Sequence, residues 1–229
     1  MKISACVFDA YGTLFDVSAA ARAAAAESGN ERLADCWQDL AADWRRKQLE
    51  YSWLRAVTGE HRDFWRVTKD GLDWAMAVQG LQGDAALRDR LLALYWTLDA
   101  YPEVPDVLRK LRHTGVQTAI LSNGSPEMLE AAVASAGIDA LLDDVISVER
   151  VGVFKPSPKV YELVPTRFHC ARDEVLFVSS NGWDAACAAR FGFITAWINR
   201  AGDPMDRLGH PPHEEMKDLS MIPAMAVAI

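Results

Sequence analysis

The chain has 229 residues, half of them hydrophobic, and a formal net charge of −8 at pH 7. This length can bury one core and a smaller subdomain, while no apolar run approaches the ~20 residues that a transmembrane helix needs. The negative charge argues against a nucleic-acid partner, and Asp9 interrupts the apolar run at the N-terminus, which therefore predicts a strand rather than a signal peptide. Without CxxC spacing, the cysteines indicate reduced core residues and a cytoplasmic protein: Cys6, Cys36, Cys170 and Cys187.

The first part of the chain changes from strand to helix. A strand over Ile3–Phe8 delivers Asp9 onto a turn that contains Gly12. Apolar residues then recur at helical spacing, or helix-forming residues dominate, in the segments 19–26, 31–57, 64–78 and 85–98. A break with two prolines follows at residues 101–105. We therefore predict an all-helical cap subdomain over residues 15–100, inserted into a core made of residues 1–14 and 101–229.

The rest of the core alternates between helices and strands. The pattern predicts helices over 107–113, 125–136, 158–168 and 184–191, and strands over 116–121, 145–148, 175–178 and 194–198. Such alternation predicts an α/β fold with a Rossmann-like parallel sheet and helices on both faces. A ligand site is then expected at the carboxyl ends of the strands. Residues 202–229 are predicted to be irregular.

Four polar segments follow strands or precede helices in this core. They are Asp9 to Thr13, Ser122-Asn123, Lys155 before a proline, and Ser179 to Asp184. Each segment alone is typical of an ordinary turn. Together, and at these positions, they indicate a catalytic site.

In order and in sequence, the four segments resemble the L-2-haloacid dehalogenases of the haloacid dehalogenase superfamily. The resemblance covers nearly the whole chain, and the run Trp44-Arg45-Arg46-Lys47-Gln48 is similar to a signature of that family's cap. The Mg-dependent phosphatases of the superfamily have a second aspartate two residues after the first, where this chain has Tyr11. They also have acidic metal ligands where Ser179 and Ser180 stand here.

The resemblance implies hydrolysis of short-chain (S)-2-haloalkanoic acids to (R)-2-hydroxyalkanoic acids. Asp9 would displace the halide with inversion and form an aspartyl ester, which water would hydrolyse. The implied partners are the 2-haloacid, water and halide, and no metal or other cofactor takes part. A homodimer is also implied, without nucleic acid or membrane.

The resemblance also assigns residues to roles. Its catalytic set is Asp9, Thr13, Lys155, Ser179, Asn181 and Asp184, with Asp9 as nucleophile and Asp184 as the base that activates water. Lys155 would offset the repulsion between the carboxylates of enzyme and substrate. Its substrate-binding set is Ala10, Tyr11, Arg45, Leu49, Phe64, Ser122, Asn123, Tyr161 and Trp183, in which Arg45 and Asn123 stabilise the leaving halide.

Other interpretations of these residues remain open. Arg45 could form a surface ion pair with Asp43 or Glu50, as charges on helices usually do. Tyr11, Leu49, Phe64 and Trp183 could be ordinary core residues. For the whole chain, the alternatives are a Mg-dependent phosphomonoesterase of the same superfamily and a catalytically idle binding protein. A haloalkane dehalogenase is excluded, because no strand–nucleophile–helix elbow is paired with a downstream histidine.

Overall fold

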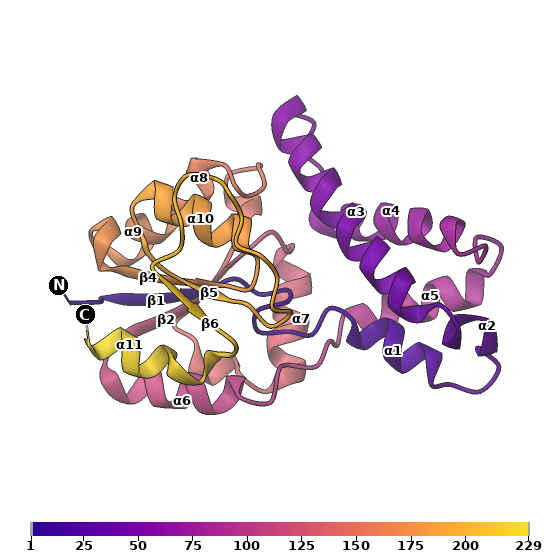
Figure 1. Cartoon of the computed structure of the whole chain (residues 1–229), viewed down its shortest axis with the longest axis horizontal. Helices are drawn as coiled ribbons and strands as arrows, with labels where there is room; N and C mark the ends of the chain where they lie inside the picture. The colour runs from indigo at the N-terminus through magenta and orange to yellow at the C-terminus, as the bar shows by residue number, and fades with distance from the viewer. Residues whose placement is uncertain (1, 229) are drawn as a thin grey trace.

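The computed structural model describes residues 2–228, and they contain a six-stranded sheet in the order β3-β2-β1-β4-β5-β6 (Figure 1). All neighbouring strands run parallel. This confirms the predicted α/β fold with a parallel sheet. The strands are β1 (Ala5–Phe8), β2 (Gln117–Ser122), β3 (Asp144–Ser147), β4 (Val175–Ser179), β5 (Ile194–Ile198) and β6 (Glu214–Met216).

Apolar strands at the centre of the sheet explain why helices cover both of its faces. Every residue of β1 is buried, and β1 lies between β2 and β4. A strand that is apolar on both sides needs cover on both. Helices α6 and α11 cover one face and α8 to α10 the other (Figure 1). The core helices are α6 (Val104–Thr114), α7 (Pro126–Ala136), α8 (Pro158–Tyr161), α9 (Leu163–Phe168), α10 (Gly182–Phe191) and α11 (Ile222–Ala228).

The remaining helices form a separate body beside the sheet, which we call the cap (Figure 1). Its helices are α1 (Ala19–Ala25), α2 (Glu31–Ala34), α3 (Trp37–Thr58), α4 (Phe64–Val78) and α5 (Ala85–Tyr95). Asp63 and Asp84 begin α4 and α5 by accepting hydrogen bonds from the backbone of their first turns. The longest helix, α3, packs along α4. Within residues 2–228, none of the helices combines the length and the apolar character needed to cross a membrane.

The two segments that join cap and core run side by side. Phe15 and Ala100 form an antiparallel bridge, and the Tyr101 N–H donates to the Leu14 carbonyl at 2.9 Å. The Asp16 N–H donates to the Asp99 carbonyl, also at 2.9 Å. We propose that the cap spans residues 15–100 as the sequence predicts, because these bonds hold the outgoing and returning chain together at those positions.

Several predicted elements differ from the observed ones. The prediction that residues 202–229 are irregular is wrong, because they contain β6 and α11. The segment 31–57 is two helices, α2 and α3, and 158–168 is divided into α8 and α9. Helix α6 begins at Val104, three residues early, because Pro105 lies in the first turn, where a helix does not need its N–H.

Candidate active site

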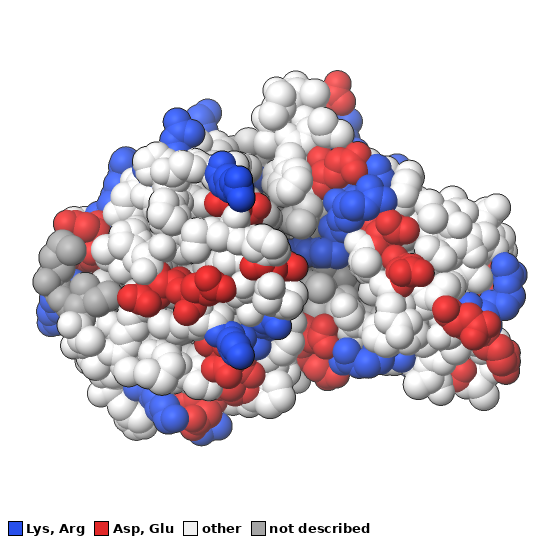
Figure 2. Space-filling view, in the orientation of Figure 1, with Lys and Arg blue, Asp and Glu red and all other residues white. Residues whose placement is uncertain are grey.

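The polar segments meet at the carboxyl ends of three neighbouring strands. Asp9 follows β1, whose last residue, Phe8, is paired with Ile120 of β2 and Val178 of β4. Ser122 and Ser179 end β2 and β4 and therefore lie on either side of Asp9. Figure 2 shows that the surface is hollowed between the core and the cap, with Lys and Arg atoms beside the hollow.

The Asp9 carboxylate is held by three donors. Oδ2 accepts from the Thr13 hydroxyl at 3.0 Å and from Asn181 Nδ2 at 3.0 Å. Oδ1 accepts from the Lys155 ammonium at 3.1 Å. The aspartate is almost fully buried, and the donors come from three different segments of the chain. This arrangement fixes the direction in which a carboxylate oxygen can attack a bound molecule.

Lys155 connects Asp9 to a second buried carboxylate. Its Nζ lies 2.8 Å from Asp184 Oδ2 as well as 3.1 Å from Asp9 Oδ1, and the lysine side chain is only 1% exposed. Asp184 also accepts from the Tyr161 hydroxyl at 2.7 Å and from the Ser179 hydroxyl at 3.1 Å. One buried cation therefore neutralises two carboxylates that would otherwise repel each other.

Burial and these neighbours change the proton affinity of the group. Burial raises the pKa of Asp184 above its ordinary value, and the Asp9 charge acts in the same direction, while Lys155 and Tyr161 act against it. Burial disfavours the charged form of Lys155, but the charges of Asp184 and Asp9 outweigh burial and raise its pKa. A carboxylate with a raised pKa is suited to accept a proton near neutral pH.

Arg45 reaches from the cap to this site. Its Nη2 donates to the Tyr11 carbonyl at 2.9 Å and to Asn181 Oδ1 at 3.2 Å. The alternative that Arg45 forms a surface pair is wrong, because the neighbouring Arg46 makes those pairs, with Asp43 at 2.8 Å and Glu50 at 3.4 Å. Asn181 accepts from Arg45 and donates to Asp9, so a single side chain connects the Arg45 cation with the Asp9 carboxylate.

Aromatic side chains surround Tyr11. Its ring stacks on Tyr95 with centroids 5.7 Å apart and lies 5.8 Å from Phe64, whose ring is 6.1 Å from Phe154. Trp183, in the first turn of α10, meets Trp53 of the cap edge-on at 5.4 Å. The Tyr11 hydroxyl and the Trp183 indole N–H are buried and have no hydrogen-bond partner within residues 2–228. Tyr11 and Trp183 therefore each combine contacts to other aromatic rings with a buried donor.

The other predicted substrate-binding residues lie at the ends of β1 and β2 or on α3. The Ala10 carbonyl accepts the N–H groups of Thr13, Leu14 and Phe15 and so closes the turn after Asp9. The Ser122 hydroxyl accepts the Gly124 N–H at 3.1 Å, and Asn123 Oδ1 accepts the Lys155 N–H at 2.9 Å. Leu49 lies one helical turn after Arg45 on α3 and is half-buried. The direct roles assigned to these residues stay predictions.

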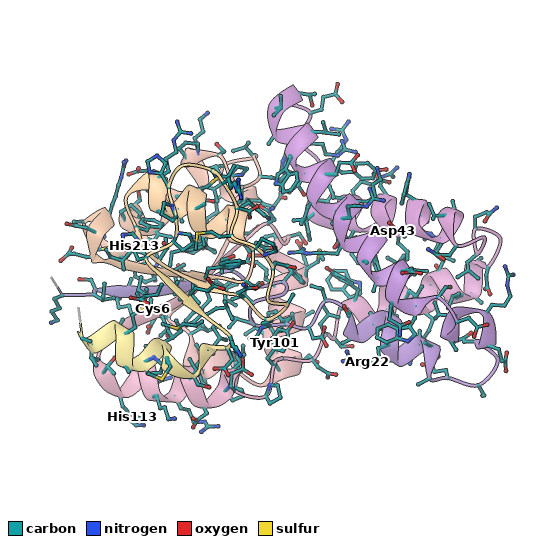
Figure 3. The ribbon with its side chains drawn as sticks, in the orientation of Figure 1. Cys6, Arg22, Asp43, Tyr101, His113 and His213 are labelled. Atoms are coloured by element: carbon teal, nitrogen blue, oxygen red, sulfur yellow. The ribbon has the colours of Figure 1, made fainter. Side chains whose placement is uncertain are left out.

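Two residues to which the sequence analysis gave no role in the site hold Thr13. The Ser180 N–H donates to Thr13 Oγ1 at 2.8 Å, and Arg200 Nη2 donates to the Thr13 carbonyl at 3.0 Å. Arg200 also lies 3.6 Å above the ring of Tyr101, which is labelled in Figure 3 where the chain returns from the cap. Arg200 follows the carboxyl end of β5, and this position after a strand end could have identified it as a residue near the site.

The donor set at this site does not resemble that of a metal centre. Within the part of the chain described here, no three His, Cys, Asp or Glu side chains gather in a way that could hold a metal ion. The Lys155 ammonium, 3.1 Å and 2.8 Å from the two carboxylates, supplies the positive charge between them. Tyr11 contributes an aromatic ring at the position where the Mg-dependent phosphatases described above have their second aspartate.

Known proteins are similar to this chain over most of its length. Residues 3–192 match the family model of the haloacid dehalogenase-like hydrolases. The chain is 41% identical to (S)-2-haloacid dehalogenase 1 of Pseudomonas sp. (strain CBS-3), over 99% of this chain and 98% of that protein. It is also 41% identical to an (S)-2-haloacid dehalogenase of Burkholderia cepacia, over 96% of this chain and 93% of that protein.

A solved structure is similar over nearly the same length. It is the L-2-haloacid dehalogenase of Xanthobacter autotrophicus with chloropropionic acid covalently bound. Its TM-score to this chain is 0.86 and its sequence identity 37%, over 97% of this chain and 98% of the other.

Proposed function

The chain belongs to the haloacid dehalogenase-like hydrolases, and we propose that it hydrolyses short-chain (S)-2-haloalkanoic acids to (R)-2-hydroxyalkanoic acids. The observation that carries this proposal is the Lys155 ammonium shared between Asp9 and Asp184. It leaves one carboxylate positioned as a nucleophile and a second, with a raised pKa, positioned as a base.

In the first step, an Asp9 carboxylate oxygen attacks C2 of the substrate from the side opposite the halogen. The new C–O bond forms as the C–X bond breaks, the halide leaves with the bonding electron pair, and C2 is inverted. Arg45 and the Asn123 amide stabilise the negative charge that develops on the halide. The Ser122 hydroxyl and the turn at Ala10 and Tyr11 hold the substrate carboxylate.

In the second step, water attacks the carbonyl carbon of the Asp9 ester. Asp184 accepts a proton from this water while Asn181 positions it. The bond between the Asp9 carbonyl carbon and the ester oxygen then breaks, and the departing oxygen takes the proton back from Asp184. The C2–O bond remains intact, so the alcohol leaves with the configuration set in the first step. The Asp9 carboxylate is regenerated, and the net products are the 2-hydroxy acid, halide and a proton. Thr13 and Ser179 hold the two carboxylates in place throughout.

A halide-release assay tests the proposal. Purified protein is expected to release chloride from (S)-2-chloropropionate but not from the (R) enantiomer, and addition of EDTA is expected to leave the rate unchanged. Phosphate release from a phosphomonoester that EDTA abolishes would instead support the phosphatase alternative. No turnover and no binding of any 2-haloacid would favour the idle binding protein.

Arg45→Ala is expected to lower kcat by about 100-fold or more, like the loss of an oxyanion donor. The reason is that the contact of Arg45 with the halide strengthens only as the halide charge develops. Steady-state halide release measures the effect. Arg46→Ala is the matched control, because Arg46 pairs with Asp43 and Glu50 on the surface of the same helix. A larger loss in the Arg46 variant would contradict the assignment.

Tyr161→Phe is expected to shift the acid limb of the kcat profile to higher pH. The Tyr161 hydroxyl donates to Asp184 Oδ1 and lowers the pKa of that carboxyl, whose pKa burial already raises. Without the hydroxyl the pKa of Asp184 rises further, so the base becomes protonated at a higher pH. The profile of kcat against pH checks this, and an unshifted acid limb would show that Asp184 is not the base.

The exposed surface of α3 and the state of the cysteines support two proposals, on assembly and on location. We propose a homodimer, supported by the exposed apolar side chains of Leu54 and Val57 on α3, and light scattering on the purified protein tests it. We propose a cytoplasmic location, supported by four cysteines that are all free thiols within residues 2–228.

A further inference from the structure

One face of α3 carries a line of three side chains, and the first and last of them contact the core. Arg45, Leu49 and Trp53 are spaced four residues apart, and residues at this spacing lie on the same side of a helix. The first contacts Asn181 and the backbone of Tyr11, and the last contacts Trp183. At about 1.5 Å per residue, Trp53 lies about 12 Å further along the axis than Arg45.

The core presents the side-chain partners of Arg45 and Trp53 within three consecutive residues. Asn181 donates to Asp9 and accepts from Arg45, and Trp183 follows two residues later in the first turn of α10. In the cap and in the core alike, therefore, a polar side chain (Arg45 or Asn181) is followed along the chain by an indole ring (Trp53 or Trp183). The two indoles meet edge-on at 5.4 Å, and Trp53 remains 37% exposed at the outer side.

We propose that Trp53 is a specificity-determining residue that limits the length of the alkyl chain on C2 of the substrate. This rests on the proposed function, because it takes the halide to lie at Arg45 and the alkyl group to extend past Leu49. A methyl group ends before the indole pair. A longer chain meets the rings of Trp53 and Trp183 and has to displace them.

Trp53→Ala is expected to raise the ratio of kcat/KM for (S)-2-bromohexanoate to that for (S)-2-bromopropionate by at least about tenfold, the range of a few methylene groups in an apolar pocket. Trp53→Phe keeps a ring against Trp183 and is expected to raise the ratio less. Trp65→Ala is the matched control, because Trp65 is a cap tryptophan paired with Trp96 at 4.7 Å rather than with the core. Its ratio is expected to equal that of the wild type.

Each result supports or overturns the inference. An unchanged ratio in an active Trp53→Ala enzyme overturns it while leaving the proposed function intact. An equal rise in Trp65→Ala also overturns it, because the effect would then come from a loosened cap. If Trp53→Ala does not fold, Trp53→Phe decides by the presence or absence of its smaller rise. Failure of the wild type to release bromide from either substrate overturns the proposed function, and this inference with it.

Discussion

Asp9→Asn is expected to lower kcat by about 10⁴-fold or more, the scale on which removal of a catalytic nucleophile acts. Asparagine keeps the shape of the side chain, but its amide cannot displace a halide. The protein is expected to remain folded, since the Thr13, Lys155 and Asn181 side chains can adjust around one changed atom. Halide release and thermal unfolding of the variant check both parts.

Loss of activity alone does not identify Asp9 as the nucleophile, whereas the origin of the product oxygen does. With enzyme in excess over substrate in ¹⁸O-labelled water, the first hydroxy acid is expected to carry almost no label, because its oxygen comes from Asp9. Solvent oxygen enters Asp9 instead, and mass spectrometry should find it in a peptide containing residues 3–22. Labelled first product with unlabelled Asp9 would mean direct attack by water and would exclude the ester mechanism.

Lys155→Met is expected to abolish detectable dehalogenation and to destabilise the fold by about 3–5 kcal/mol, as happens when one partner of a buried ionic group is removed. Methionine fills most of the space but leaves the carboxylates of Asp9 and Asp184 buried without their shared cation. Urea unfolding measures the loss. Lys159→Met, which changes an exposed lysine on α8, is the matched control and is expected to change stability little.

The stability deficit of Lys155→Met is expected to depend on pH. Lys155 lowers the pKa of Asp184 in the folded protein, so its removal raises that pKa further above the value in the unfolded chain. The folded variant then binds more protons than the unfolded chain, and its stability falls as pH rises. The deficit should therefore shrink as the pH is lowered from about 8 to about 5. A deficit that is constant over this range would mean that lost packing, not charge, causes it.

Most of the sheet could be predicted because its central strands bury apolar side chains. Strands β1, β2, β4 and β5 are almost wholly buried, and their sequences are correspondingly apolar. Strand β6, Glu-Glu-Met, is exposed or half-buried and pairs with β5 through its backbone. Backbone pairing leaves no trace in side-chain pattern, so β6 could not be found in this way.

The positions of some polar residues could also be predicted. Asp9 follows β1 and Asp184 lies in the first turn of the helix after β4, and such positions in a parallel sheet indicate a ligand site. The roles given to Asp9, Lys155 and Asp184 came from the resemblance to the haloacid dehalogenases and stay predictions. Arg200 was missed because its partner is the carbonyl of Thr13, a group that every residue has. The division between α2 and α3 at Asp35 and Cys36 was missed because helical spacing of apolar residues continues across it.

The position of β1 at the centre of the sheet also affects how the chain folds during synthesis. This strand is made first, but its partners begin only at Gln117 and Val175. At about 5–20 residues per second, its two backbone edges stay unpaired and its apolar side chains stay uncovered for several seconds or more. The helices of the cap pack on one another within residues 19–95, so they can fold in this interval. The strand that carries the catalytic carboxylate therefore depends on protection from aggregation until most of the chain has left the ribosome.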